Sequence, residues 1–478
     1  MTDRNPAPQP QQARVRYPKY TKLFCFINAV VCLGTMGIVG LKLVFGERAS
    51  GFINSENRNL AEFPSFSLKS YFSGDYTAGI VNYYTDTIAS REQLRAAANR
   101  FTDLFGIHGK GSVEIYGNAV QGGQERLTEE DKLQEQHNVT VYTGTQATTT
   151  TTSGAGTTVQ TEATETEPIQ TKQRTETGND GAIVNGSVIV SGKGTPNVRA
   201  MSVFGGVFER GKRYAGVLND YKTMVGNTVN VYNLSAPLAA AYYMPENLKS
   251  QFSDEHECIK NIGTALNGVI NVDVFDAIGA HTDEYIYFRT DHHWQPLGAY
   301  YAAQKFAECA QVPFADLSTY EKCQKEGFVG TMYGYTNYLA DLQKYPDTFY
   351  YYKPQNQYTI RYYDDTFQNP QDGKLFYEFA SGVNTYSTIL GGDVNIAEIK
   401  TDVGNGRTVV VIKNSYGNAL VPFLVGSFEK IYVVDFRHVR IGMQDLFRRT
   451  GATDVLFCMA ISSCYTDSHI NAIKEIMQ

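Results

Sequence analysis

The sequence predicts an α/β fold built on a mostly parallel sheet. Three short runs are almost entirely apolar, namely Thr408–Ile412, Ile431–Val434 and Asp454–Phe457. Helical patterns separate these runs and follow the last one. Apolar strands that alternate with helices are typical of a parallel sheet covered on both faces. With 478 residues, 42% of them hydrophobic and 13% aromatic, the chain is long enough for one large domain or two ordinary ones.

The first 45 residues predict a tail and a membrane helix. Residues 1–19 are polar and rich in Pro and Gln, which predicts a disordered cytoplasmic tail. The run Leu23–Leu41 carries no charge, and its 19 residues are about what a helix needs to cross the hydrocarbon core. We therefore expect a transmembrane helix over residues 20–45.

Basic residues before this run set its expected orientation. Because Arg14, Arg16, Lys19 and Lys22 precede it, the positive-inside rule places the N-terminus in the cytoplasm and the bulk of the chain outside. The expected location is the cell membrane, with a single pass. A cleaved signal peptide is the alternative, with Arg48–Gly51 as a weak cleavage site.

The exported part is expected to form one domain from residues 52–123 and 182–478. Residues 70–105 show helical spacing of apolar side chains, and Val113–Tyr116 and Ser187–Val190 have the pattern of strands. Residues 124–181 are dominated by Thr, Glu, Gln and Gly. They offer too little apolar surface to offset the entropy of ordering, which predicts a disordered Thr-rich insertion at a hairpin tip.

The C-terminal helices complete the predicted pattern. They are expected at Ala419–Phe428, at Met443–Arg449 with Gly451 closing it, and at Ser468–Met477. Parallel sheets bind ligands at the carboxyl ends of their strands, so the residues that follow each strand are candidates for function.

Ser415 occupies one such position, between a buried strand and the start of a helix. A serine there can act as a nucleophile, because helix N-terminal amides can stabilise an oxyanion and Gly417 lets the backbone turn. The segment is not a G-x-S-x-G elbow. The alternative role for Ser415 is a helix N-cap, which is a common use of serine.

Asp291 and His293 occupy a second such position, after the strand expected at Tyr285–Phe288. The Asp could fix the imidazole tautomer while the His acts as general base. A structural His pair is one alternative, and a metal site with His292 is another. Neighbouring histidines in a strand point to opposite faces and ligate one ion poorly, so neither a metal nor another cofactor is expected.

The segment Arg289–Ala303 (RTDHHWQPLGAYYAA) resembles the signature of the DHHW protein family. That family is related to the SGNH-hydrolase-like domains of the alginate O-acetyltransferases. Ser55–Pro64, Val411–Leu424 (VIKNSYGNALVPFL) and Val433–Arg440 (VVDFRHVR) resemble further blocks of these proteins. The resemblance spans nearly the whole exported chain apart from the insertion, and it implies a three-layer SGNH-hydrolase-like domain.

The resemblance also implies roles for individual residues. Ser415 would be the nucleophile, His293 the base and Asp291 its orienting carboxylate. Arg437 would help to position the substrate, and Asn414 or Asn418 could donate to an oxyanion. The chain departs from the family pattern at one point, because Asn414 stands where an Asp is expected before the serine.

Three functions fit these features. The first is a membrane-anchored O-acyltransferase that acetylates exopolysaccharide or cell-wall glycan outside the cytoplasm, with acyl groups delivered by a membrane-bound O-acyltransferase partner that the resemblance implies. The second is a carbohydrate acetyl esterase of the same fold, and the third is a non-catalytic glycan-binding or assembly protein. A net charge of −7 argues against nucleic acid as a partner, because phosphate binding needs clustered Lys and Arg.

Overall fold

The computed structural model of the chain describes residues 19–53, 58–105, 112–116 and 188–478. The predicted Thr-rich insertion (124–181) lies outside the described residues, as does the predicted tail apart from Lys19. The chain divides into two compact units, one ending at Leu94 and the other running from Arg95 to Gln478. The candidate site belongs entirely to the second unit.

The first unit is mainly helical. Its helices are α1 (Lys19–Phe45), α2 (Leu68–Phe72), α3 (Asp75–Asp86) and the start of α4 (Arg91–Phe105). The last three agree with the helical pattern predicted over 70–105, and α1 coincides with the expected membrane helix. Among the residues that the structure describes, no helix has both the length and the apolar character needed to cross a membrane.

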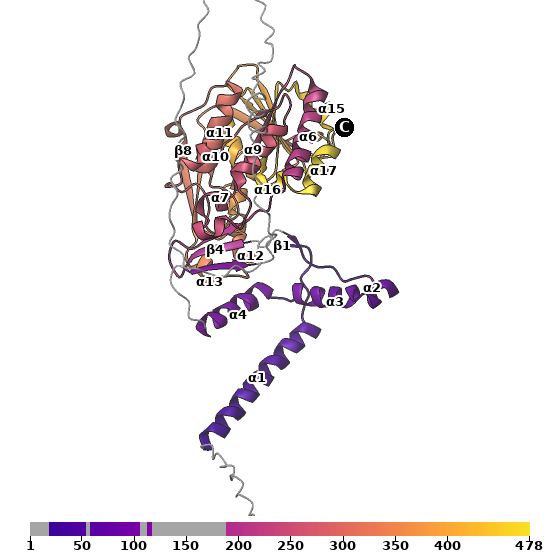
Figure 1. Ribbon diagram of the computed structural model, residues 1–478, viewed down its shortest axis with the longest axis vertical. Coiled ribbons are helices and arrows are strands. Elements are labelled where there is room, and N and C mark those ends of the chain that lie inside the picture. The colour runs from indigo at the N-terminus through magenta and orange to yellow at the C-terminus, as the bar shows by residue number, and fades with distance from the viewer. Residues whose placement is uncertain (1–18, 54–57, 106–111, 117–187) are drawn as a thin grey trace, which may run out of the picture. The chain divides into compact units, whose positions relative to one another are not determined.

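Most of the second unit is coloured from magenta to yellow in Figure 1. It is built on a mixed sheet of eight strands, ordered β11-β10-β12-β14-β13-β15-β6-β7. From β14 to β7 every neighbouring pair is parallel, and β11, β10 and β12 join one side of the sheet as antiparallel strands. The strands are β6 (Asn230–Ala236), β7 (Ile270–Asn271), β10 (Tyr358–Tyr363), β11 (Gln371–Asp372), β12 (Ile396–Thr401), β13 (Thr408–Lys413), β14 (Lys430–Asp435) and β15 (Asp454–Ala460).

Helices cover both faces of this sheet. On β15, Phe457 packs against Tyr221 of helix α6, with ring centroids 4.9 Å apart. Its neighbour Leu456 pairs with Tyr232 of β6, which packs against Phe306 of helix α11. Because successive strand residues point to opposite faces, α6 and α11 lie on opposite sides of the sheet. The helices of this layered domain are α6 (Phe208–Val225), α9 (Glu255–Ala265), α11 (Pro296–Ala310), α14 (Tyr416–Leu424), α15 (Met443–Thr450) and α17 (Asp467–Glu475).

The predicted C-terminal series is confirmed. The three apolar runs are the parallel strands β13, β14 and β15. Gly451 closes α15 in a left-handed conformation, with φ of +67°. Helix α14 begins three residues earlier than predicted, at Tyr416, so that it starts directly after Ser415.

The strand predicted at Tyr285–Phe288 is wrong. This run joins no sheet apart from a single bridge between Tyr287 and Trp294. Its carbonyls are satisfied by other groups: the Arg199 guanidinium donates to the carbonyls of Tyr287 and Phe288. The apolar side chains are buried because they pack into the core, and burial of such a run does not by itself require a ladder of strands.

Two smaller sheets complete the second unit. Strands β3 (Ser112–Tyr116), β4 (Val188–Lys193) and β5 (Arg199–Ser202) pair in an antiparallel sheet. The pairing of Tyr116 with Val188 places the ends of β3 and β4 together across residues 117–187. Strands β8 (Glu321–Phe328) and β9 (Asp347–Lys353) form an antiparallel pair that carries Asp347 toward the segment Arg289–Trp294.

Candidate active site

A cleft of about 440 Å³ opens at the carboxyl ends of the parallel strands. Leu238 follows β6, Ser415 follows β13, Arg437 follows β14 and Ser463 follows β15, and all four residues line this cleft. Chain positions that are far apart therefore meet at one edge of the sheet, as the carboxyl-end rule predicts.

Ser415 stands at the start of α14 but does not cap the helix with its side chain. The Asn414 side chain caps the helix instead, because its Oδ1 accepts a hydrogen bond from the Tyr416 N–H at 3.1 Å. The Ser415 hydroxyl is directed to His293 instead, with 2.7 Å between Oγ and Nε2. The alternative of an N-cap serine therefore does not describe this side chain.

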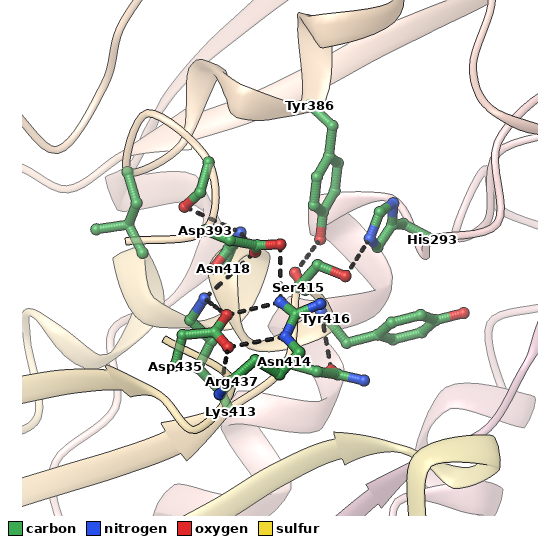
Figure 2. A network of polar contacts seen from close by, with 12 residues as sticks. His293, Tyr386, Asp393, Lys413, Asn414, Ser415, Tyr416, Asn418, Asp435 and Arg437 are labelled. Atoms are coloured by element: carbon green, nitrogen blue, oxygen red, sulfur yellow. Dashed lines mark hydrogen bonds and ion pairs between the residues drawn. The ribbon is translucent and has the colours of Figure 1, made fainter. Parts of the chain in front are cut away.

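The structure brings together Asp291, His293 and Ser415. His293 Nδ1 lies 2.6 Å from Asp291 Oδ1. Its Nε2 meets the serine hydroxyl (Figure 2). In the tautomer with the proton on Nδ1, Nε2 is left to accept the proton of Ser415. Carboxylate, imidazole and hydroxyl in this order are the arrangement that activates a serine nucleophile.

Asp291 is buried and held on both oxygens. Oδ1 also accepts from the His293 backbone N–H at 3.0 Å, and Oδ2 accepts from the Thr331 N–H at 2.9 Å. Burial opposes ionisation, but the neighbouring histidines and these hydrogen bonds hold the pKa of Asp291 well below its usual range. Gly330 packs directly against this carboxylate, since a Cβ there would lie 2.3 Å from Asp291.

Aromatic rings fix the orientation of His293. The ring of Tyr386 stacks on the imidazole, with centroids 3.9 Å apart and planes 9° apart. The Tyr386 hydroxyl donates to the Ser415 carbonyl at 3.1 Å, so one residue holds both base and nucleophile. Beneath them, the buried Trp294 donates its indole N–H to the Tyr416 carbonyl at 3.0 Å.

His292 lies beside the relay without joining it. Its Nδ1 meets the Thr331 hydroxyl at 2.6 Å, and burial together with the neighbouring His293 lowers its pKa to about 4. The expectation that the two histidines point to opposite faces is wrong, because the segment is a turn, and their rings lie 3.8 Å apart. Potential ligand atoms of Asp291, His292 and His293 lie within 4.8 Å of one another, yet both nitrogens of His293 are engaged by Asp291 and Ser415.

A cluster of four charges lies on the other side of Ser415 (Figure 2). Lys413 is fully buried, and its Nζ lies 2.8 Å from Asp435 and 3.4 Å from Asp393. Arg437 contacts the same two carboxylates, each at 2.7 Å. Burial opposes ionisation of both acids, but the charges of Lys413 and Arg437 hold the pKa of Asp393 and of Asp435 below the usual range.

Replacing Lys413 by Met is expected to destabilise the protein by about 3–5 kcal/mol, because Arg437 alone then has to compensate the two carboxylates and one negative charge stays unbalanced. Urea unfolding of the full chain checks this value. The double variant Lys413→Met/Asp435→Asn should recover most of the loss, since it removes the unpaired charge. A single variant as stable as the wild type would contradict the role of Lys413.

The two asparagines proposed as oxyanion donors are both engaged elsewhere. Asn414 Nδ2 donates to the Ser463 hydroxyl at 2.9 Å, and Asn418 Nδ2 donates to Asp393 at 3.1 Å. Asn418 is not among the described residues that line the cleft, whereas Arg437 is.

Gly417 is required for packing, since a Cβ there would lie 2.5 Å from the Lys413 side chain.

Comparison with known proteins identifies the family of the chain. The family model described as DHHW protein matches residues 56–434. A search of curated proteins found no match. A crystal structure of a DHHW family protein from Eubacterium siraeum is 43% identical, covers 60% of this chain and 95% of its own, and has a TM-score of 0.58.

Two further structures are less similar in sequence and have lower TM-scores. PatB1 from Bacillus cereus, solved with a sulfonyl adduct, is 16% identical over 56% of this chain and 94% of its own, with a TM-score of 0.47. The O-acetyltransferase domain of Pseudomonas putida AlgJ is 15% identical over 56% and 89%, with a TM-score of 0.31. The family match covers most of the chain and includes the Asp-His-His-Trp turn that carries His293, so the chain belongs to the DHHW protein family.

Proposed function

We propose that the protein is an O-acyltransferase that acetylates a carbohydrate through Ser415, His293 and Asp291. The observation that carries the proposal is the continuous hydrogen-bonded chain from Asp291 Oδ1 through His293 to Ser415 Oγ, with links of 2.6 Å and 2.7 Å. A serine activated in this way performs acyl transfer.

The proposed reaction has two halves. Ser415 Oγ attacks the carbonyl carbon of an acetyl donor while His293 Nε2 takes the hydroxyl proton. The same imidazole then gives this proton to the departing group, and an acetyl-serine remains. In the second half, a sugar hydroxyl gives its proton to His293 and attacks the acetyl carbon. The bond from this carbon to Ser415 Oγ then breaks, and His293 returns the proton to Oγ, which restores the free enzyme.

Positive charge at the cleft supports the oxyanion that forms in each half. The N-terminus of α14 begins directly after Ser415, and Arg437 lines the same cleft. Backbone N–H groups at a helix start and a guanidinium both stabilise developing negative charge. Because the Tyr416 N–H donates to Asn414 and Arg437 contacts Asp393 and Asp435, we assign to the helix start and Arg437 a long-range electrostatic part in stabilising the oxyanion, not a direct hydrogen bond to it.

The test uses purified full chain, p-nitrophenyl acetate as donor and an oligosaccharide mixture as acceptor. We expect mass spectrometry to find an acetyl group on the peptide that contains Ser415 and acetylated oligosaccharide in the product. Release of acetate at the same rate with and without acceptor, and no acetylated sugar, would instead identify an esterase.

We further propose that residues 20–45 anchor the chain in the cell membrane, with the bulk of the chain outside and a membrane-bound O-acyltransferase as the source of acyl groups. The uncharged run Leu23–Leu41 and the basic residues before it support the anchor. Alkaline extraction of membranes should leave the full chain in the pellet and release a chain that lacks residues 1–45. Release of both chains would overturn the anchor.

A further inference from the structure

A second hollow, of about 970 Å³, takes no part in the relay. Its walls come from the end of β10, from β11 and from the segment 377–395 that leads into β12. We call this hollow the aromatic groove because four aromatic residues line it, Tyr363 among them. Three of the rings, those of Tyr362, Tyr377 and Phe379, form a row. Their centroids are 6.2 Å apart for the first pair and 5.8 Å apart for the second.

The rings of the aromatic groove are exposed at one end. Phe379 exposes 84% of its surface, the largest exposed fraction of any large apolar side chain described in this part of the chain. A lone exposed aromatic needs no explanation, but three rings in contact along a concave surface are typical of a binding site.

The backbone around the rings leaves no space for side chains. A Cβ at Gly373 would lie 2.3 Å from the Tyr362 ring, and a Cβ at Gly391 would lie 3.2 Å from the Tyr377 ring. Gly391 and Gly392 both have positive φ, of +76° and +107°, as the turn after Leu390 requires. This turn carries Asp393 to the far wall of the groove.

The charge of the groove restricts the ligand. Among the described residues that line it, the charged ones are Asp372 and Asp393, and none is Lys or Arg. Asn384, Ser387 and Asn395 add neutral amides and a hydroxyl. Asp372 is paired with Arg361 at 3.1 Å, and Asp393 is paired with Lys413 and Arg437, so the lining adds no cation that could hold an anionic sugar. Aromatic faces with hydroxyl and amide groups suit neutral sugar rings.

The aromatic groove and the serine cleft share a wall. Asp393 lines the groove, Arg437 lines the cleft, and their side chains are 2.7 Å apart. The segment 377–395 also carries Tyr386, whose ring stacks on His293 (Figure 2). The groove and the cleft are therefore neighbours on the surface of the second unit, separated by this ion pair.

We propose that the aromatic groove binds a neutral glycan chain and presents its hydroxyl groups to Ser415. The presentation of hydroxyl groups to Ser415 rests on the proposed acyl transfer. The binding of the glycan rests on the groove alone.

The test measures binding by isothermal titration calorimetry of the full chain. The probes are three neutral tetrasaccharides, built from glucose, mannose or N-acetylglucosamine, and tetragalacturonate as the anionic counterpart. We expect at least one neutral probe to bind, and tetragalacturonate to bind at least about tenfold more weakly. Phe379→Ala should weaken the neutral probe by about tenfold or more, because it removes a stacking face.

The matched control is Phe72→Ala, since Phe72 is 81% exposed and lies on α2, outside the groove. It should bind the neutral probe as the wild type does. The inference is overturned if no neutral probe binds, if tetragalacturonate binds more tightly, or if Phe379→Ala binds as the wild type does. Unchanged thermal unfolding of Phe379→Ala excludes misfolding as the cause of weaker binding.

Failure of this inference is distinguishable from failure of the proposed function. If Ser415→Ala releases product from p-nitrophenyl acetate as the wild type does while still binding the sugar, the acyl-transfer proposal falls and the aromatic groove stands. If Ser415→Ala is inactive but no neutral probe binds, the inference about glycan binding is wrong and the acyl-transfer proposal is unaffected.

Discussion

Ser415→Ala and His293→Ala are each expected to lower kcat for ester turnover by about 10⁴–10⁶-fold, and the double variant should be no slower than the worse single one. The reason is the contact of 2.7 Å between Oγ and Nε2. A hydroxyl without its base is a poor nucleophile, and a base without the hydroxyl has no proton to take, so the two residues act as one unit. Steady-state hydrolysis of p-nitrophenyl acetate by the purified chain measures this effect.

Ser318→Ala provides the control for these variants. Ser318 lies in an exposed turn, where its hydroxyl contacts only Asp316 among the described residues, far in sequence from the relay. Its turnover should equal that of the wild type. If the double variant loses as much as the product of the two single losses, the residues act independently and the relay is wrong.

The contact between Asp291, His293 and Ser415 could be predicted because sequence motifs mark these three residues. A serine after a buried strand and an Asp-x-His pair are both local patterns, and the carboxyl-end rule brings them to one edge of the sheet. The strand expected before Asp291 was wrong because an apolar run is consistent with any buried backbone. Here the Arg199 side chain, not a neighbouring strand, satisfies the carbonyls of that run.

The residues that hold the relay could not be predicted, because they carry no motif and come from other parts of the chain. Thr331 fixes Asp291 from the loop after β8, and Tyr386 reaches His293 from the segment before β12. Asp393 was missed for the same reason, although the pair Gly391-Gly392 before it signals a turn. Lys413 stands two residues before Ser415 in the sequence, but only the structure shows that its charge is fully buried between two carboxylates.

The contacts of Asn414 explain how an Asn can stand where an Asp is expected. Its Oδ1 accepts from the N–H groups of Tyr416 and Ala460, and its Nδ2 donates to Ser463. An amide serves both kinds of partner, whereas a carboxylate would have no hydrogen to donate. The departure from the expected Asp therefore leaves the helix start and the Ser415 hydroxyl in place.

Asp291→Asn is expected to lower kcat by about 10⁴-fold with little loss of folded protein. Donors meet both oxygens of this carboxylate. Oδ1 meets the backbone N–H and Nδ1 of His293, and Oδ2 meets the backbone N–H and the hydroxyl of Thr331. An amide must place its NH₂ on one side. If it faces His293, the imidazole proton moves to Nε2, which can then no longer accept the proton of Ser415.

The opposite orientation is also unfavourable, because it sets the NH₂ against the Thr331 N–H at the 2.9 Å position of Oδ2. Thr331→Val is the milder comparison variant, since it removes the hydroxyl at 3.1 Å but keeps the N–H, and its kcat should fall by no more than about tenfold.

The pH profile of the wild type tests the charge of Asp291 separately. Because the pKa of Asp291 lies well below its usual range, wild-type activity should not fall through protonation of this carboxylate above about pH 4, where an ordinary Asp begins to titrate. An Asp291→Asn enzyme that keeps more than about a tenth of wild-type kcat would show that His293 does not need this carboxylate, and the relay would then have only two working members.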